Sequence, residues 1–76
     1  MEKFLENFAD QFEETNVSLL TEETIFKELE EWSSLISLSV IAMVDEEYGV
    51  TLKGDDIRNS NTLKDLFNIV ISKTKS

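Results

Sequence analysis

The strongest constraint on the fold is the scarcity of residues that interrupt helices. The 76-residue sequence has no proline and only two glycines, and no long stretch alternates Val, Ile or Thr with polar residues. Apolar residues recur at helical spacing instead, which predicts an all-α fold. A chain of this length has room for one small core, so we expect a single domain over residues 1–76.

The apolar spacing predicts a small bundle of three principal helices plus one short helix. In the first helix, predicted over 2–15, Phe4, Phe8 and Phe12 recur every four residues with acids between them. A long loop is expected over 16–24, with its apolar residues tucked back onto the core. The segment 25–32 either contains one helical turn or, being short and rich in Glu, stays irregular.

The second principal helix is predicted over 34–48, and Gly49 ends it because glycine readily adopts the left-handed backbone found at helix ends. A short helical turn is expected over 55–59. Thr62 is expected to cap the last helix, since its hydroxyl can accept from the backbone three residues on, and Asp65 reinforces that first turn. The inner stripe of the last helix is predicted to be Leu63, Leu66, Phe67, Val70 and Ile71.

The composition argues against an enzyme. The sequence contains no Cys and no His, so it lacks a thiolate nucleophile and the usual general base near neutral pH. A chain this short also has little room for a water-excluding cleft. We therefore expect a protein with no catalytic residues of its own.

The charge of the chain indicates which partners it favours. Sixteen acidic and seven basic residues give a formal net charge of −9, which repels nucleic-acid phosphates and anionic lipids and attracts proteins with basic patches. No apolar run reaches the length of a membrane span, and no charged-then-apolar leader opens the chain. We expect a cytoplasmic monomer that binds neither nucleic acid nor membrane. Crowding of the acids is expected to raise native carboxyl pKa values on average.

The second helix carries more apolar residues than one buried stripe needs. The stripe predicted to face the core is Ser37, Val40, Ile41, Val44 and Tyr48. A second apolar face, running toward two acids, is formed by Leu35, Leu38 and Ala42 beside Asp45 and Glu46. An apolar strip flanked by acids is typical of a docking surface, and the alternative is that the long loop covers and buries it.

The sequence around this helix carries a family resemblance. Before it stands Phe26-Lys27-Glu28-Leu29-Glu30-Glu31-Trp32-Ser33-Ser34-Leu35, and at its end Asp45-Glu46-Glu47-Tyr48-Gly49-Val50. This pattern is similar to the acyl carrier protein family, in which an Asp-Ser-Leu motif opens the second helix and an acidic cluster with an aromatic residue closes it. The interval from Ser34 to Tyr48 matches without a gap, and Thr62-Leu63-Lys64-Asp65-Leu66 resembles the start of the family's last helix. The resemblance covers most of the chain, with the first helix matching only in length and pattern.

The resemblance implies that Ser34 is the attachment point for a covalent 4′-phosphopantetheine arm, transferred from coenzyme A by a phosphopantetheinyl transferase. The arm would hold acyl groups as thioesters. It would present them to acyl-transferring and condensing enzymes with basic patches, in a fatty-acid, polyketide, nonribosomal peptide or related pathway. The partner-binding surface implied by the resemblance is Leu35, Leu38, Ala42, Asp45 and Glu46.

One position departs from the family pattern. Ser33 stands where an Asp usually precedes the modified serine, although the interval to Tyr48 and the following Leu35 select Ser34 as the modified residue. Ser33 is then expected to cap the helix, and Trp32 to anchor its loop to the core. The alternative function is an unmodified acidic interaction module, in which the serines only cap.

Two acidic runs raise the question of a metal site. They are Glu28, Glu30 and Glu31, and Asp45, Glu46 and Glu47. Neither run has the alternating acids and glycine of a calcium loop. We expect solvated charged faces with weak attraction for divalent cations, and no metal site.

Overall fold

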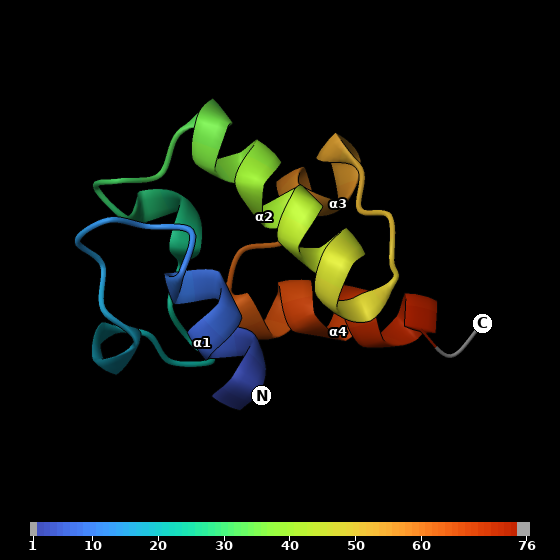
Figure 1. Cartoon of the computed structure of the whole chain (residues 1–76), viewed down its shortest axis with the longest axis horizontal. Helices are drawn as coiled ribbons and strands as arrows, with labels where there is room; N and C mark the ends of the chain where they lie inside the picture. Colours follow the sequence, from blue (N-terminus) through green and yellow to red (C-terminus); the bar gives the residue numbers. More distant parts are fainter. Residues whose placement is uncertain (1, 75–76) are drawn as a thin grey trace.

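The computed structural model describes residues 2–74 and contains four α-helices in that range, with two short 3₁₀-helices between the first two (Figure 1). In chain order the elements are α1 (Glu2–Ala9), η1 (Val17–Leu19), η2 (Phe26–Glu28), α2 (Ser34–Tyr48), α3 (Gly54–Arg58) and α4 (Leu63–Thr74). The predicted all-α bundle of three principal helices and one short helix is confirmed. None of the described helices is both long enough and apolar enough to cross a membrane.

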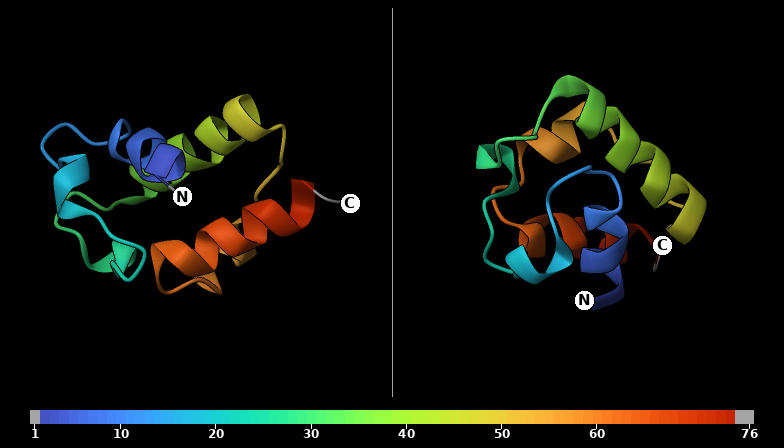
Figure 2. Two further views of the ribbon diagram at one scale, coloured as in Figure 1. Left: turned by 90° about the horizontal axis from the view of Figure 1, so that it is seen from below. Right: turned by 60° about the vertical axis from the view of Figure 1, so that its left-hand side comes forward.

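The helices surround one apolar core. Helix α2 contacts both α1 and α4, and the short α3 packs on α4 (Figures 1 and 2). The apolar side chains with at most 1% exposure come from three helices and η2: Phe4, Phe8, Phe26, Val40, Val44, Leu63, Leu66 and Val70. Fully burying an apolar side chain of this size contributes about 1.5–3 kcal/mol, so this set dominates the stability of the fold.

Phe8 is the centre of an aromatic cluster that holds the irregular first half of the chain. Its ring centroid lies 6.3 Å from that of Phe4, 5.3 Å from Phe12, 5.8 Å from Phe26 and 6.3 Å from Trp32. Ring contacts at such distances add to the free energy of apolar burial. They fix residues 12–32 against α1 although that segment contains only two turns of 3₁₀-helix.

The predicted length of the first helix is wrong, because α1 ends at Ala9 and not at residue 15. After Ala9 the hydrogen bonds tighten to a three-residue spacing, from Gln11 N–H to the Phe8 carbonyl and from Phe12 N–H to the Ala9 carbonyl. The next backbone donors bond to a carboxylate distant in the sequence, that of Glu31. Phe12 is buried as its spacing suggested, but it reaches the core from a turn.

Only some of the apolar residues in the loop between α1 and α2 pack onto the core. Leu20 is buried at 5% exposure, as expected of the loop's apolar residues, but Val17 is 38% exposed and Leu19 is 68% exposed. None of the three residues of η1 is buried, and Leu20 is the residue that follows this helix as its C-cap. Of the two alternatives for 25–32, the structure has the helical turn, which is η2.

Helix α2 has the predicted bounds. Gly49 follows it with φ of 66°, and its N–H donates to the Asp45 carbonyl, which closes the helix in the left-handed geometry that glycine tolerates. Val40 and Val44 of the predicted core stripe are fully buried, whereas Ser37, Ile41 and Tyr48 are half-buried. Met43, which the prediction omitted, is also buried.

Helix α4 begins with the predicted cap. The Asp65 N–H donates to the Thr62 hydroxyl oxygen at 3.2 Å, and the Thr62 N–H donates to the Asp65 carboxylate at 3.1 Å. The backbone N–H groups of Thr62 and Asn61 hold the pKa of Asp65 below its usual range. Of the predicted inner stripe, Leu63, Leu66 and Val70 are buried and the other two residues are half-buried. Helix α3 lies one residue earlier than predicted.

Candidate functional site

The two serines at the start of α2 have different roles in the structure. Ser33 is the N-cap: its backbone is extended, with φ of −157° and ψ of 172°, and its hydroxyl oxygen accepts from the Ile36 N–H at 3.2 Å. This is the capping role that the sequence predicted for Ser33. Ser34 is the first residue of the helix and is exposed, so its hydroxyl is accessible at the end of the helix.

Trp32 fixes the chain as it enters α2. Its ring stacks on Phe8 with 8° between the planes, and it meets the Phe26 ring edge-on at a centroid distance of 5.0 Å. The predicted anchoring role of Trp32 is therefore confirmed. Because Trp32 lies two residues before Ser34, these contacts also set the position of the exposed serine.

Glu31 makes a second set of contacts that fixes the chain just before Ser34. Its carboxylate accepts from the N–H groups of Glu13, Glu14 and Thr15 at 3.2, 3.0 and 2.6 Å, and from the Thr15 hydroxyl at 2.7 Å. The Thr15 hydroxyl and these backbone donors hold the pKa of Glu31 below its usual range. The prediction that this acid belongs to a merely solvated face is wrong, because its oxygens bind the turn after α1.

A groove of about 600 Å³ opens beside Ser34, between α2, α3 and η2. Its apolar wall includes Trp32, Ile41 and Ile57, and its polar lining comes from three serines and two basic residues. The full lining is Lys27, Trp32, Ser33, Ser34, Ser37, Leu38, Ile41, Gly54, Ile57 and Arg58. The site therefore combines an accessible hydroxyl with an adjacent groove of mixed polarity.

The face predicted for docking is exposed in the structure. Leu35 is 73% exposed and Leu38 is 63% exposed, and Ala42 is exposed as well. Asp45 and Glu46 are exposed further along the helix. At 3.6 residues per turn the five residues fall within an arc of about 100° on α2. The alternative in which the loop buries this strip is excluded.

The core side of α2 lies opposite this arc. Val40 and Val44 are both fully buried there, and the Tyr48 ring lies 6.1 Å from that of Phe4. Helix α2 itself contains three acids at its C-terminal end and no basic residue. A partner that approaches the exposed face therefore meets leucines near Ser34 and negative charge at the far end of the helix.

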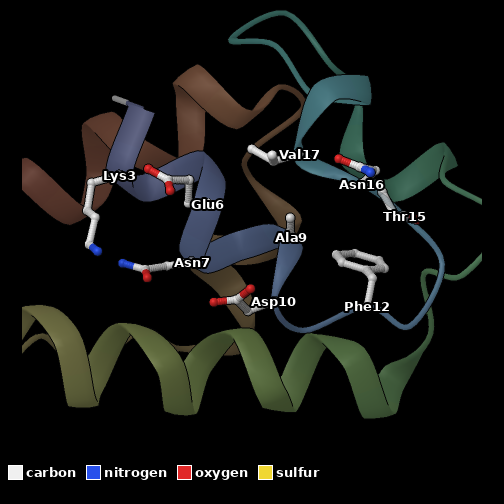
Figure 3. Close-up of a pocket in the computed structure, with 9 residues that line it drawn as sticks. All are labelled: Lys3, Glu6, Asn7, Ala9, Asp10, Phe12, Thr15, Asn16 and Val17. Carbon is white, nitrogen blue, oxygen red and sulfur yellow. The ribbon is translucent and has the colours of Figure 1, made fainter.

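A separate hollow of about 430 Å³ lies between α1 and the segment that follows it, and none of the predicted site residues lines it. Figure 3 shows its polar side chains along α1 and the facing loop that carries Phe12 and Thr15. Within residues 2–74, no three acidic side chains are grouped in a way that could hold a metal ion.

Sequence reasoning missed the groove residues Lys27, Ile57 and Arg58. Lys27 and Arg58 are 31 residues apart, and the Lys27 ammonium donates to the Arg58 carbonyl oxygen at 3.0 Å. Helical spacing carries no information about such a contact. The one available signal was Ile57, an isolated apolar residue between charged neighbours, which indicated a side chain turned inward.

Comparisons with protein-family models, with curated proteins and with solved structures give no significant match to this chain.

Proposed function

We propose that the protein is an acyl carrier protein that bears a 4′-phosphopantetheine arm on Ser34. The observation that carries this proposal is the position of Ser34, exposed as the first residue of α2 immediately after the N-cap Ser33. It adds to the sequence resemblance, which selects the same serine from its distance to Tyr48. Because the arm brings its own thiol, a chain without Cys can take part in thioester chemistry.

The attachment reaction requires little of the carrier. The Ser34 hydroxyl oxygen attacks the pantetheine-side phosphorus of the coenzyme A diphosphate, the bond between the two phosphates breaks, and 3′,5′-ADP leaves. The transferase supplies the base that takes the hydroxyl proton, consistent with a carrier that has no His. An exposed serine at a helix end can enter the active site of another protein without unfolding of its own core.

The start of α2 suits the product of this reaction. The phosphodiester carries one negative charge, and the first N–H groups of a helix point toward a group attached there. The positive end of the dipole of a 15-residue helix also favours an anion at this position. No acid lies in the first turn of α2 to oppose that charge.

The exposed face of α2 suits recognition by the enzymes that use the arm. Leu35 and Leu38 offer apolar surface next to the attachment site, and Asp45 and Glu46 offer charge for a basic patch. Complementary charge increases the rate of encounter, and the buried apolar contacts contribute to affinity. An acyl-transferring or condensing enzyme would thus meet the arm and the docking surface on one helix.

The second candidate is an unmodified acidic module that binds partners through the same face. Ser33 favours it, because this residue stands where the family has an Asp that the transferase would meet. The two functions differ in whether any covalent group is found on Ser34.

The proposal is tested by loading. The protein is incubated with Mg²⁺, coenzyme A and a broad-specificity phosphopantetheinyl transferase, and then with acetyl-coenzyme A in place of coenzyme A. We expect intact mass to increase by one arm in the first reaction and by one acetylated arm in the second. Hydroxylamine should remove only the acetyl group, since it cleaves thioesters. Absence of any mass gain, where a standard carrier protein is fully modified, would favour the unmodified module.

A further inference from the structure

Lys27 lines the groove beside Ser34 and is held there by two neutral groups. Its side chain is half-buried, and its ammonium donates to the Arg58 carbonyl oxygen at 3.0 Å. The same nitrogen lies 5.9 Å from the centroid of the Phe26 ring. These contacts orient the ammonium and attract its charge, but neither contributes a negative ion.

The charge of Lys27 has no counter-ion among residues 2–74. The ion pairs in that range join Arg58 to Asp55 and Lys73 to Asp56, and none involves Lys27. Arg58 also lines the groove, but its guanidinium is already bound to the Asp55 carboxylate. In a chain with sixteen acids and seven bases, an unpaired cation in a groove that Ser34 also lines is an unusual placement.

The surroundings of Lys27 increase its attraction for an anion. Trp32, Ile41 and Ile57 form an apolar wall of the groove, so the local dielectric constant is lower than that of water. An opposite charge that enters the groove is therefore attracted more strongly than it would be at the open surface. The lysine still has donors to offer, because an ammonium carries three protons and one of them bonds to the Arg58 carbonyl.

We propose that Lys27 binds the phosphodiester of the arm on Ser34 and so directs the start of the arm into the groove between α2 and α3. This rests on the proposed function, which provides an anion on Ser34, a residue that lines the same groove as Lys27. In this arrangement the phosphate lies on the Ser37 side of α2. Leu38 lines the groove as well, whereas Leu35 and Ala42 lie outside it and stay open for docking.

The test is a thermodynamic cycle between the arm and the lysine. Melting temperatures are measured with and without the arm for the wild-type protein and for Lys27→Met, Lys27→Arg and Lys64→Met. Lys64 is an exposed lysine outside the groove, so Lys64→Met controls for the change in net charge. The lost Arg58 contact affects both forms of Lys27→Met equally and cancels in the comparison.

We expect the change in melting temperature on arm attachment to be less favourable in Lys27→Met than in the other three proteins. The difference should be on the order of 1–6 °C in melting temperature, as for a partly exposed ion pair in a small domain. It should shrink with added salt, and the ³¹P shift of the phosphodiester should change in Lys27→Met but not in Lys64→Met. If arm attachment changes the melting temperature equally in all four proteins, the proposal is overturned.

Repeating the cycle with acetyl and malonyl groups on the arm separates the phosphate from a cargo carboxylate as the bound anion. If Lys27→Met already alters the change in melting temperature when the arm carries acetyl, the result supports phosphate binding. Dependence on Lys27 that appears only with malonyl would overturn it, because the anion would then be on the cargo. Intact mass is recorded before the melting temperatures. A protein that takes up no arm would contradict the proposed function, and with it the role of Lys27. Failure of the proposed function is thus seen in the mass, whereas failure of the Lys27 proposal alone is seen in the melting temperatures.

Discussion

The carboxylate of Glu31 accepts hydrogen bonds from both the backbone N–H and the hydroxyl of Thr15, at 2.6 Å and 2.7 Å. This contact joins the turn after α1 to the residue that precedes Trp32, across 16 positions of the sequence. It ends α1 early, and it fixes one side of the segment that leads into α2. The position of Ser34 therefore depends on a contact between Glu31 and the turn after α1, which lies outside the quoted motif.

We predict that Glu31→Gln lowers the melting temperature at neutral pH. The amide keeps one acceptor oxygen, but its NH₂ group would face the N–H donors that the second carboxylate oxygen satisfies. Thermal unfolding followed by circular dichroism measures the effect. Glu30→Gln is the matched control, because Glu30 is the exposed neighbouring acid. An equal loss in both variants would show that the loss of one charge, and not the hydrogen bonding, is responsible.

The difference in stability between the wild-type protein and Glu31→Gln should also depend on pH. The pKa of Glu31 is lower in the native state than in the unfolded state. The contribution of this carboxylate to the free energy of unfolding is therefore fully present above the unfolded-state pKa of about 4.3, and it is lost as the pH falls through the native pKa. The difference in melting temperature between wild type and Glu31→Gln should be constant from pH 7 to about pH 5 and should narrow in more acidic solution. A difference that stays constant down to the acid-unfolded state would contradict this.

For Glu31 and Asp65 the direction of the pKa shift is opposite to the average rise expected from crowded acids. Each carboxylate accepts several hydrogen bonds from nearby backbone N–H groups and a threonine. These donors stabilise the ionised form more than desolvation destabilises it. Net charge alone therefore does not predict how an individual carboxylate titrates.

The two faces of α2 should respond differently to truncation. Val44 is fully buried, so Val44→Ala should cost about 1–3 kcal/mol in the free energy of unfolding. Leu38 is 63% exposed, so Leu38→Ala should change it by no more than about 0.5 kcal/mol. Urea denaturation monitored at Trp32 gives both values. A larger loss for Leu38→Ala than for Val44→Ala would reverse the assignment of the faces.

Ser33→Asp tests whether the departure from the family pattern matters. Asp caps a helix as well as Ser does, so the bond to the Ile36 N–H and the melting temperature should be nearly unchanged. If the transferase recognises an acid at this position, its kcat/KM for the variant should rise several-fold. Equal kcat/KM values for the two proteins would show that Ser33 is neutral for recognition.

A double reversal, Asp45→Lys with Glu46→Lys, should slow modification by the transferase, and added salt should reduce the difference from wild type. Both acids are exposed beside the leucine face. The control is Glu22→Lys with Glu23→Lys, which changes the net charge equally at the exposed turn between η1 and η2. If both double variants slow the reaction to the same extent, total charge and not the α2 surface controls encounter.

The sequence predicted the features that local chemistry decides. The bounds of α2 follow from Ser33 and Gly49, and the start of α4 follows from Thr62 and Asp65, because each terminus is capped by residues within a few positions. The exposed leucines were also predictable, since Val40 and Val44 already supply the buried stripe of the helix. These elements depend on spacing and capping alone.

The features that the sequence did not predict depend on contacts between distant residues. Helical periodicity continued through Phe12, but Glu31 binds the backbone donors that a longer α1 would have used. Lys27 reaches the Arg58 carbonyl from 31 positions away, and this places a cation in the groove. A single sequence carries no signal for either contact.

The most direct test of the carrier proposal compares Ser34→Ala with Ser33→Ala under transferase conditions that fully modify a standard carrier protein. Intact mass and peptide mapping are recorded for both variants and for the wild type. The proposal predicts one arm on Ser34 of the wild type, one arm on Ser33→Ala despite its lost helix cap, and none on Ser34→Ala. An arm mapped to Ser33, or an unmodified wild-type protein, would contradict it.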